Sequence, residues 1–82
     1  MITVRFFAML KGKVGKEEVK LPLPGPITFG ELRDLLKKEF PAIAEHIEKR
    51  SIMVSVNQEL ATSDTIIKDG DEIALLPPFS GG

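Results

Sequence analysis

The chain has 82 residues and no cysteine; 43% of the residues are hydrophobic, and 11 basic and 12 acidic side chains leave a net charge of -1. This length and hydrophobic content predict one small folded domain, and the near-neutral charge gives no electrostatic reason to expect nucleic acid or a membrane as a partner. The absence of cysteine excludes disulfides and thiolate metal sites, and the lack of a long apolar run or a signal peptide predicts a cytoplasmic protein.

The first predicted element is a strand over residues 2–10, which are rich in β-branched and aromatic side chains. Alternation along this strand separates a core face from an outer face. The core face carries Ile2, Val4, Phe6 and Ala8. Phe7 and Met9 then face outward, toward either a second covered face or a partner. Residues 11–16 are expected to form a lysine-rich loop, which leads into a second strand over residues 19–23 and closes a hairpin.

An amphipathic helix is the clearest local signal in the chain. Thr28 and Glu31 have the spacing of a capping box, which predicts where the helix begins, and Pro41 ends it. The apolar stripe of this helix consists of Phe29, Leu32, Leu35, Leu36 and Phe40. On the opposite face, Asp34 and Lys38 have the i, i+4 spacing of an ion pair.

A second, shorter helical segment is expected over residues 42–50, with Ile43 and Ile47 turned inward. His46 is the only histidine in the chain. It has no partners at metal-ligand spacing, so we expect a solvated surface residue and no metal site.

Three more strands complete the pattern. The third covers residues 52–56, and a tight turn at residues 57–58 leads into a short fourth strand around residues 59–61. After a reversal at residues 69–70, the fifth strand covers residues 72–76. Alternation turns Ile73 and Leu75 into the core and Ala74 and Leu76 outward.

The element order is therefore β-β-α-β-β-β, which predicts an α+β domain with one main amphipathic helix on one face of a mixed five-stranded sheet. The ubiquitin-like β-grasp fold has this order, with the first and last strands parallel at the centre. The domain is expected to cover residues 1–76 and an extended tail residues 77–82. On the helix-free face, Phe7, Leu60 and Leu76 form an exposed apolar patch. Such a patch indicates an interaction site, the alternative being scattered surface hydrophobes.

The tail is Pro77-Pro78-Phe79-Ser80-Gly81-Gly82. The two prolines favour an extended start, and the two glycines make the narrowest possible peptide, with the α-carboxylate as the only chemical group at its tip. A carboxylate becomes a good acyl donor when an enzyme converts it to an acyl-adenylate, which then accepts sulfide or an amine. The alternative is an ordinary polar terminus without a function.

Four stretches of this sequence resemble the MoaD family, the sulfur-carrier small subunit of molybdopterin synthase. They are residues 4–10, 56–58, 69–72 and 76–82, and together they span the chain. Two positions depart from the family pattern: Lys11 stands where arginine is common, and Phe79 where a smaller apolar residue is common.

The resemblance implies a sulfur-transfer cycle. An adenylating, E1-like enzyme would bind the apolar patch and use ATP to convert the Gly82 carboxylate to an acyl-AMP, and a sulfur donor would leave a C-terminal thiocarboxylate. The carrier would then insert its tail into the large catalytic subunit and give its sulfur to cyclic pyranopterin monophosphate. The family also implies an assembly of two large and two small subunits. In this scheme the chain is not an enzyme by itself and binds no cofactor permanently.

The resemblance assigns roles to individual residues. Gly82 carries the reaction, and Gly81, Ser80, Phe79, Pro78 and Pro77 form the segment that threads into the partner. Phe79 anchors this segment against the partner or packs back on its own sheet. The predicted partner-binding residues are Phe7, Met9, Lys11, Leu60 and Leu76. Lys11 is either a steering charge for an anionic nucleotide or pterin phosphate, or an ordinary exposed lysine.

Two further readings stay open. The first keeps the tail chemistry and changes its destination, to a ThiS-like sulfur carrier for thiazole synthesis or to a ubiquitin-like modifier of lysines. The second is a β-grasp binding module with an inert tail. The chemical state of the terminal carboxyl group separates these readings.

Overall fold

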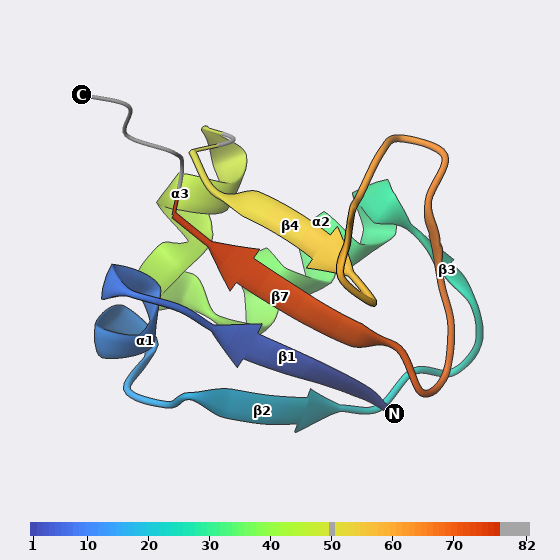
Figure 1. Cartoon of the computed structure of the whole chain (residues 1–82), viewed down its shortest axis with the longest axis horizontal. Coiled ribbons are helices and arrows are strands. Elements are labelled where there is room, and N and C mark those ends of the chain that lie inside the picture. Colours follow the sequence, from blue (N-terminus) through green and yellow to red (C-terminus); the bar gives the residue numbers. More distant parts are fainter. Residues whose placement is uncertain (50, 78–82) are drawn as a thin grey trace.

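A mixed five-stranded sheet forms one layer of the molecule, in the order β2-β1-β7-β4-β5 (Figure 1). Its strands are β1 (Ile2–Phe6), β2 (Glu18–Leu21), β4 (Met53–Val56), β5 (Glu59–Leu60) and β7 (Glu72–Leu76). The central strands β1 and β7 are parallel, with Val4 opposite Ile73, and the other pairs are antiparallel. The computed structural model describes residues 1–49 and 51–77. This arrangement confirms the predicted α+β fold with parallel first and last strands.

The helices lie on one face of this sheet (Figure 1). They are α2 (Phe29–Glu39), the 3-10 turn η1 (Pro41–Ile43) and α3 (Ala44–Glu48), while α1 (Met9–Val14) follows β1. Leu32 and Leu36 of α2 are fully buried against the sheet. The rings of Phe6 and Phe40 meet edge to face, with centroids 4.8 Å apart. Burying an apolar side chain of this size contributes about 1.5–3 kcal/mol, so the core holds helix and sheet together.

The predicted capping box starts α2. The amide of Glu31 donates to Thr28 Oγ1 at 3.1 Å, and the amide of Thr28 donates to Glu31 Oε1 at 2.9 Å. The predicted ion pair on the outer face of this helix is wrong, because Asp34 pairs with Lys37 at 3.5 Å rather than with Lys38. Lys37 also reaches Glu48 of α3 at 2.6 Å, which places its ammonium between two carboxylates.

The second helical segment also follows the prediction, since Ile43 and Ile47 are both buried. His46 differs from the expected solvated residue. It is half-buried, and its Nδ1 lies 3.2 Å from Ser51 Oγ.

The structure corrects the prediction at the end of the first strand. β1 stops at Phe6, and α1 begins at Met9, where the sequence pattern predicts strand and then loop. Ala8 is exposed and has a φ of 53°, so it turns the chain out of the sheet instead of joining the core face. Leu10 is completely buried by this turn. Burial of one large apolar side chain outweighs the strand propensity of its neighbours, which is weak and depends on context.

Two turns have the backbone that their residues predict. Asn57 and Gln58 have φ values of 52° and 72° and join β4 to β5 as a two-residue hairpin. Gly70 has a φ of 89° before β7. The short pair of β3 (Ile27–Thr28) and β6 (Ile66–Ile67) was not predicted. No helix in the described part of the chain is long and apolar enough to cross a membrane.

Candidate functional site

The sheet face that carries no helix is charged at one end and apolar at the other. Across its middle, Arg5 of β1 lies opposite Ala74 of β7, and Ser55 of β4 lies between Ala74 and Leu60 of β5. Arg5 forms long ion pairs of 3.8 Å with both Glu18 and Glu72. Arg5 and Glu18 lie level with Ala74 at the middle of β7, and Glu72 lies where β7 begins.

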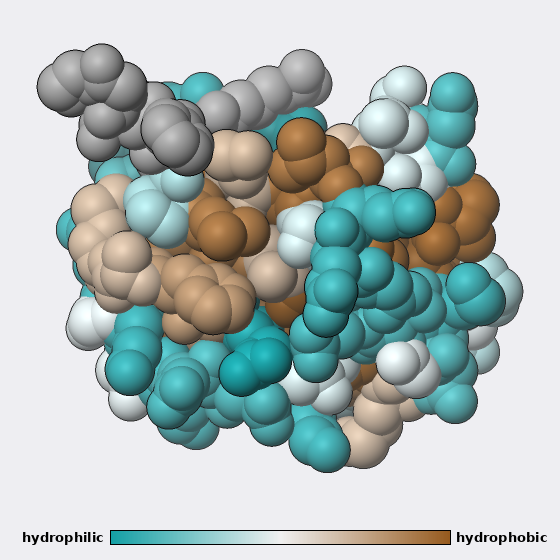
Figure 2. Space-filling view, viewed as in Figure 1, coloured by the Kyte–Doolittle hydropathy of each residue, from teal (hydrophilic) through white to brown (hydrophobic). Residues whose placement is uncertain are grey.

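The opposite end, where β7 finishes, is apolar. Leu76 of β7 lies opposite Met53 of β4. The Arg5 guanidinium carbon lies 5.8 Å from the centroid of the Phe7 ring, which places the ring on this same face. Phe7 is 38% exposed, Met9 46% and Leu60 62%. Figure 2 shows apolar side chains gathered over the ends of β1 and β7, with hydrophilic side chains on the lower part of the face. We call Phe7, Met53, Leu60, Ala74 and Leu76 the apolar patch.

The C-terminal segment leaves the sheet at this patch. The amide of Phe7 donates to the Leu75 carbonyl oxygen at 3.1 Å, which continues the β1–β7 ladder to the last residues of β7. Leu76 is half-buried between β1 and β4, and Pro77 follows it directly. Any partner that covers the apolar patch is therefore also placed where the tail begins.

The predicted site residues divide into three groups. Phe7, Leu60 and Leu76 belong to the patch on the helix-free face, where Leu76 is half-buried rather than exposed as expected, and their part in partner binding stays a prediction. Met9 and Lys11 lie on α1 beside it, so their expected positions on a strand and in a loop are wrong. Lys11 is exposed and lies 3.9 Å from Glu17, the distance of a weak surface ion pair. Pro78, Phe79, Ser80, Gly81 and Gly82 lie outside the described residues.

Met53 was missed by the sequence prediction of the patch. The signal was present, because alternation that turns Val54 and Val56 into the core also turns Met53 outward. In residues 1–49 and 51–77, no three acidic or histidine side chains come together as metal ligands would. What the site offers is a partly exposed apolar surface next to the end of β7.

Three comparisons with known proteins agree with this arrangement. The model of the ThiS family matches residues 4–82. The molybdopterin synthase sulfur carrier subunit of Haemophilus influenzae is 33% identical over 82 residues, which is all of both chains. Among solved structures, SAMP1 from Haloferax volcanii has a TM-score of 0.78 at 32% identity, with 99% of this chain and 98% of that chain covered.

A structure of a protein complex is also similar. It contains subunits 1 and 2 of the molybdopterin-converting factor from Helicobacter pylori, and the matching chain has a TM-score of 0.67 at 30% identity, with 99% and 97% covered. The resemblance to the sulfur-carrier family is thus confirmed over the whole sequence. With the sheet order, the chain exit and these matches taken together, the chain belongs to the ThiS family, and molybdopterin synthase sulfur carrier subunits are among its relatives.

Proposed function

We propose that this chain is the sulfur-carrier small subunit of a molybdopterin synthase. The observation that carries the proposal is the position of the chain exit: Leu76 ends β7 inside the apolar patch, next to Phe7 and Met53. A partner bound to the patch receives the following residues in its own active site. The relatives named as sulfur carrier subunits support the same assignment.

The first step activates the tail. A carboxylate oxygen of Gly82 attacks the α-phosphorus of ATP, pyrophosphate leaves, and the product is a mixed anhydride of the carboxyl group with AMP. A nucleophilic sulfur then attacks the acyl carbon, AMP leaves with the bonding pair, and the tail ends in a thiocarboxylate. In this step the chain contributes the acyl group that reacts. An adenylating enzyme supplies the catalytic groups.

The second step delivers sulfur in a synthase complex. The thiocarboxylate sulfur attacks a side-chain carbon of cyclic pyranopterin monophosphate held by the large subunit and displaces the oxygen substituent bound to that carbon. Water then attacks the acyl carbon, the sulfur leaves with the bonding pair and stays on the pterin, and the Gly82 carboxylate is returned. Each delivery supplies one sulfur, so a dithiolene requires two charged carriers. We infer an assembly of two large and two small subunits, and the H. pylori complex of subunits 1 and 2 supports such a partnership.

The residues of the tail fit this passage. Gly81 and Gly82 have no Cβ, so they fit a channel that is too narrow for a residue with a side chain. Pro77 and Pro78 restrict the free chain and so reduce the entropy lost when the segment enters its partner. Phe79 and Ser80 lie between the prolines and the glycines, and we assign Phe79 as an anchor in the partner.

The experiment is mass spectrometry of the intact chain after incubation with its adenylating enzyme, ATP and sulfide. The proposal predicts a mass increase equal to the difference between one sulfur and one oxygen atom, located on the Gly82 peptide. A chain that lacks Gly82 is the matched control and gains no mass. An unchanged mass with an enzyme that does release pyrophosphate would contradict the proposal.

A second candidate function is a ubiquitin-like modifier, because the chain is similar to SAMP1, the small archaeal modifier protein 1 of Haloferax volcanii. In that case the activated Gly82 is attacked by the amine of a lysine, AMP leaves, and an isopeptide bond forms. The same experiment in a cell extract separates the two functions. A modifier would yield peptides in which Gly82 is joined to the side chain of a lysine. A ThiS-like carrier for thiazole synthesis would form the same thiocarboxylate at Gly82, but it would not restore pterin sulfuration when mixed with the large subunit.

A further inference from the structure

A groove lies at the edge of the sheet beyond β4, next to the apolar patch. It has a volume of about 570 Å³ and is bounded by the first turns of α2, the end of α3, β4 and the segment after β5. Apolar side chains dominate its lining, including Phe29, Ile47 and Ile52. The proposed sulfur transfer uses Met53 and Leu60, which the groove shares with the apolar patch, and assigns no role to its other residues.

One wall of the groove is the backbone at Ile52, directly before β4. β5 pairs with β4 at Ser55 and Val56, and beyond that ladder the Ala61 amide donates to the Val54 carbonyl at 2.9 Å. Met53 turns its backbone to β7, opposite Leu76, so the alternation turns the N–H and C=O of Ile52 to the groove side, where no strand in the described residues flanks them. Exposed groups of this kind offer a donor and an acceptor to another extended chain.

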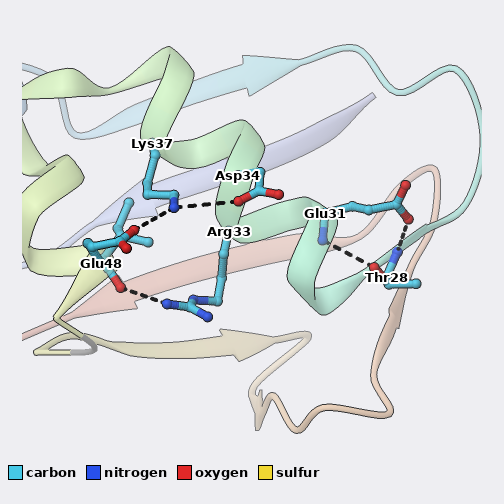
Figure 3. Close-up of polar contacts among 7 residues, drawn as sticks. Thr28, Glu31, Arg33, Asp34, Lys37 and Glu48 are labelled. Atoms are coloured by element: carbon cyan, nitrogen blue, oxygen red, sulfur yellow. Dashed lines mark hydrogen bonds and ion pairs between the residues drawn. The ribbon is translucent and has the colours of Figure 1, made fainter.

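Among the described residues that line the groove, Arg33 is the one with an ionisable side chain. Its Nη2 donates to the Ile47 carbonyl oxygen at 3.0 Å. In Figure 3, the nearby carboxylates of Asp34 and Glu48 both point to Lys37, at 3.5 and 2.6 Å. Lys37, and to a smaller extent the charge of Arg33, lower the pKa of Glu48. In residues 1–49 and 51–77, no carboxylate lies within ion-pair distance of the Arg33 guanidinium.

We propose that this groove binds an extended, apolar segment of a partner protein that carries one acidic side chain. The segment pairs with the backbone of Ile52, its carboxylate pairs with Arg33, and its neighbouring apolar side chains cover Phe29 and Ile47. A basic segment is disfavoured by the Arg33 charge, and a helix has no free backbone groups along its length to pair with Ile52. Met53 and Leu60 line the groove and also belong to the apolar patch, so one partner can cover both surfaces.

The test uses the full chain, labelled with nitrogen-15, and the peptide acetyl-Thr-Val-Thr-Glu-Thr-Val-Thr-amide. In an added strand its two valines and its glutamate face the same side. We expect saturable changes in the amide signals of groove residues such as Gly30, Ile52 and Thr62, with a Kd below about 1 mM. Replacing the glutamate of the peptide with glutamine is expected to weaken binding about tenfold, because a charge-assisted hydrogen bond is lost.

A double-mutant cycle assigns this loss to Arg33. The variant Arg33→Gln should weaken the glutamate peptide about as much and leave the glutamine peptide unchanged. Lys38→Gln is the matched control, since Lys38 is exposed on the same helix and does not line the groove; it should retain full affinity. The comparison of the two peptides needs no protein variant, so it holds even if Arg33→Gln disturbs folding.

Several results would overturn the assignment. One is the absence of saturable binding with the folded chain, and another is a set of signal changes on the helix-free face alone. Equal affinity of the glutamate and glutamine peptides would exclude the role of Arg33. Saturation of the groove by the free peptide Pro-Pro-Phe-Ser-Gly-Gly would identify the chain's own C-terminal segment as the occupant. Slower diffusion at high protein concentration, with changes at groove amides, would identify a second copy.

Discussion

Asn57 Nδ2 donates a hydrogen bond to Asp71 Oδ1 at 3.0 Å, and this bond joins the β4–β5 turn to the segment that enters β7. The carbonyl oxygen of the Asn57 side chain accepts from the Glu72 amide at 2.9 Å. Asp71 is 5% exposed and accepts a second bond at Oδ2, from the Lys68 amide at 2.9 Å. One buried carboxylate thus holds the start of the strand whose far end carries the tail.

We predict that Asp71→Asn lowers the free energy of unfolding by about 1–3 kcal/mol at pH 7, because one of the two buried donors loses its acceptor. Urea denaturation followed by circular dichroism measures the change. Asp64→Asn is the control, since Asp64 is exposed, and it should shift the midpoint little. Equal midpoints for the two variants would contradict the role of Asp71.

The same carboxylate predicts a pH dependence. Burial raises the pKa of Asp71, but hydrogen bonds from the Lys68 amide and Asn57, together with the Lys68 charge, outweigh burial and hold the pKa below its ordinary value. A pKa that is lower in the folded state means that the carboxylate stabilises the fold fully above the unfolded pKa, which is about 3.9. This contribution is lost as pH falls through the folded pKa. The difference in unfolding free energy between wild type and Asp71→Asn should therefore be constant above about pH 5 and shrink in acid.

A side chain at position 70 is predicted to destabilise the fold. The φ of Gly70 is 89°, and its amide donates to the Met1 carbonyl oxygen at 2.8 Å, so the turn also anchors the N-terminus. Gly70→Ala should destabilise the fold by about 1–2 kcal/mol, because an L residue is strained in the left-handed region. Gly25→Ala is the control, since a Cβ there meets no atom within 4 Å and no positive φ is required. Thermal unfolding of both variants checks the prediction, which fails if their midpoints shift equally.

Phe6 and Phe7 are adjacent in the chain, but we expect one to stabilise the core and the other to bind a partner. Phe6 is 1% exposed in the core, whereas Phe7 is 38% exposed in the apolar patch. Phe6→Ala should cost about 3–5 kcal/mol of stability. Phe7→Ala should cost far less and instead weaken binding to the large subunit, measured by calorimetry. A Phe7→Ala variant that binds the large subunit as tightly as wild type would exclude this residue from the docking surface.

The position of Gly82 predicts sensitivity to chain extension. One alanine added after Gly82 should abolish thiocarboxylate formation. The terminal carboxyl group then belongs to a residue with a Cβ and lies one residue too far along the channel. The melting temperature should stay unchanged, since the added residue lies beyond the folded core. Intact-mass measurement checks that the extra residue has not been trimmed, and pterin sulfuration by an untrimmed, extended chain would contradict the proposal.

Local patterns predicted most of the elements correctly. Thr28 and Glu31 identified the start of α2 because a capping box forms within one turn of the chain. Alternation placed Ile73 and Leu75 in the core and Leu76 on the helix-free face for the same local reason. The pattern failed at Ala8, where the chain leaves the sheet so that Leu10 becomes buried. Nothing within a few residues of Leu10 records that requirement.

The sequence by itself therefore determined which side chains face inward in the strands and helices that it predicted, Ala8 excepted, and it predicted the tail as the reactive segment. Only the tertiary structure decided what lies side by side. The patch forms because β1 and β7, at opposite ends of the chain, pair in parallel and bring Phe7 next to Leu76. The groove at Arg33 exists because α2 and α3 pack beside β4 and the segment after β5. Both depend on contacts between distant residues, and local periodicity carries no information on such contacts.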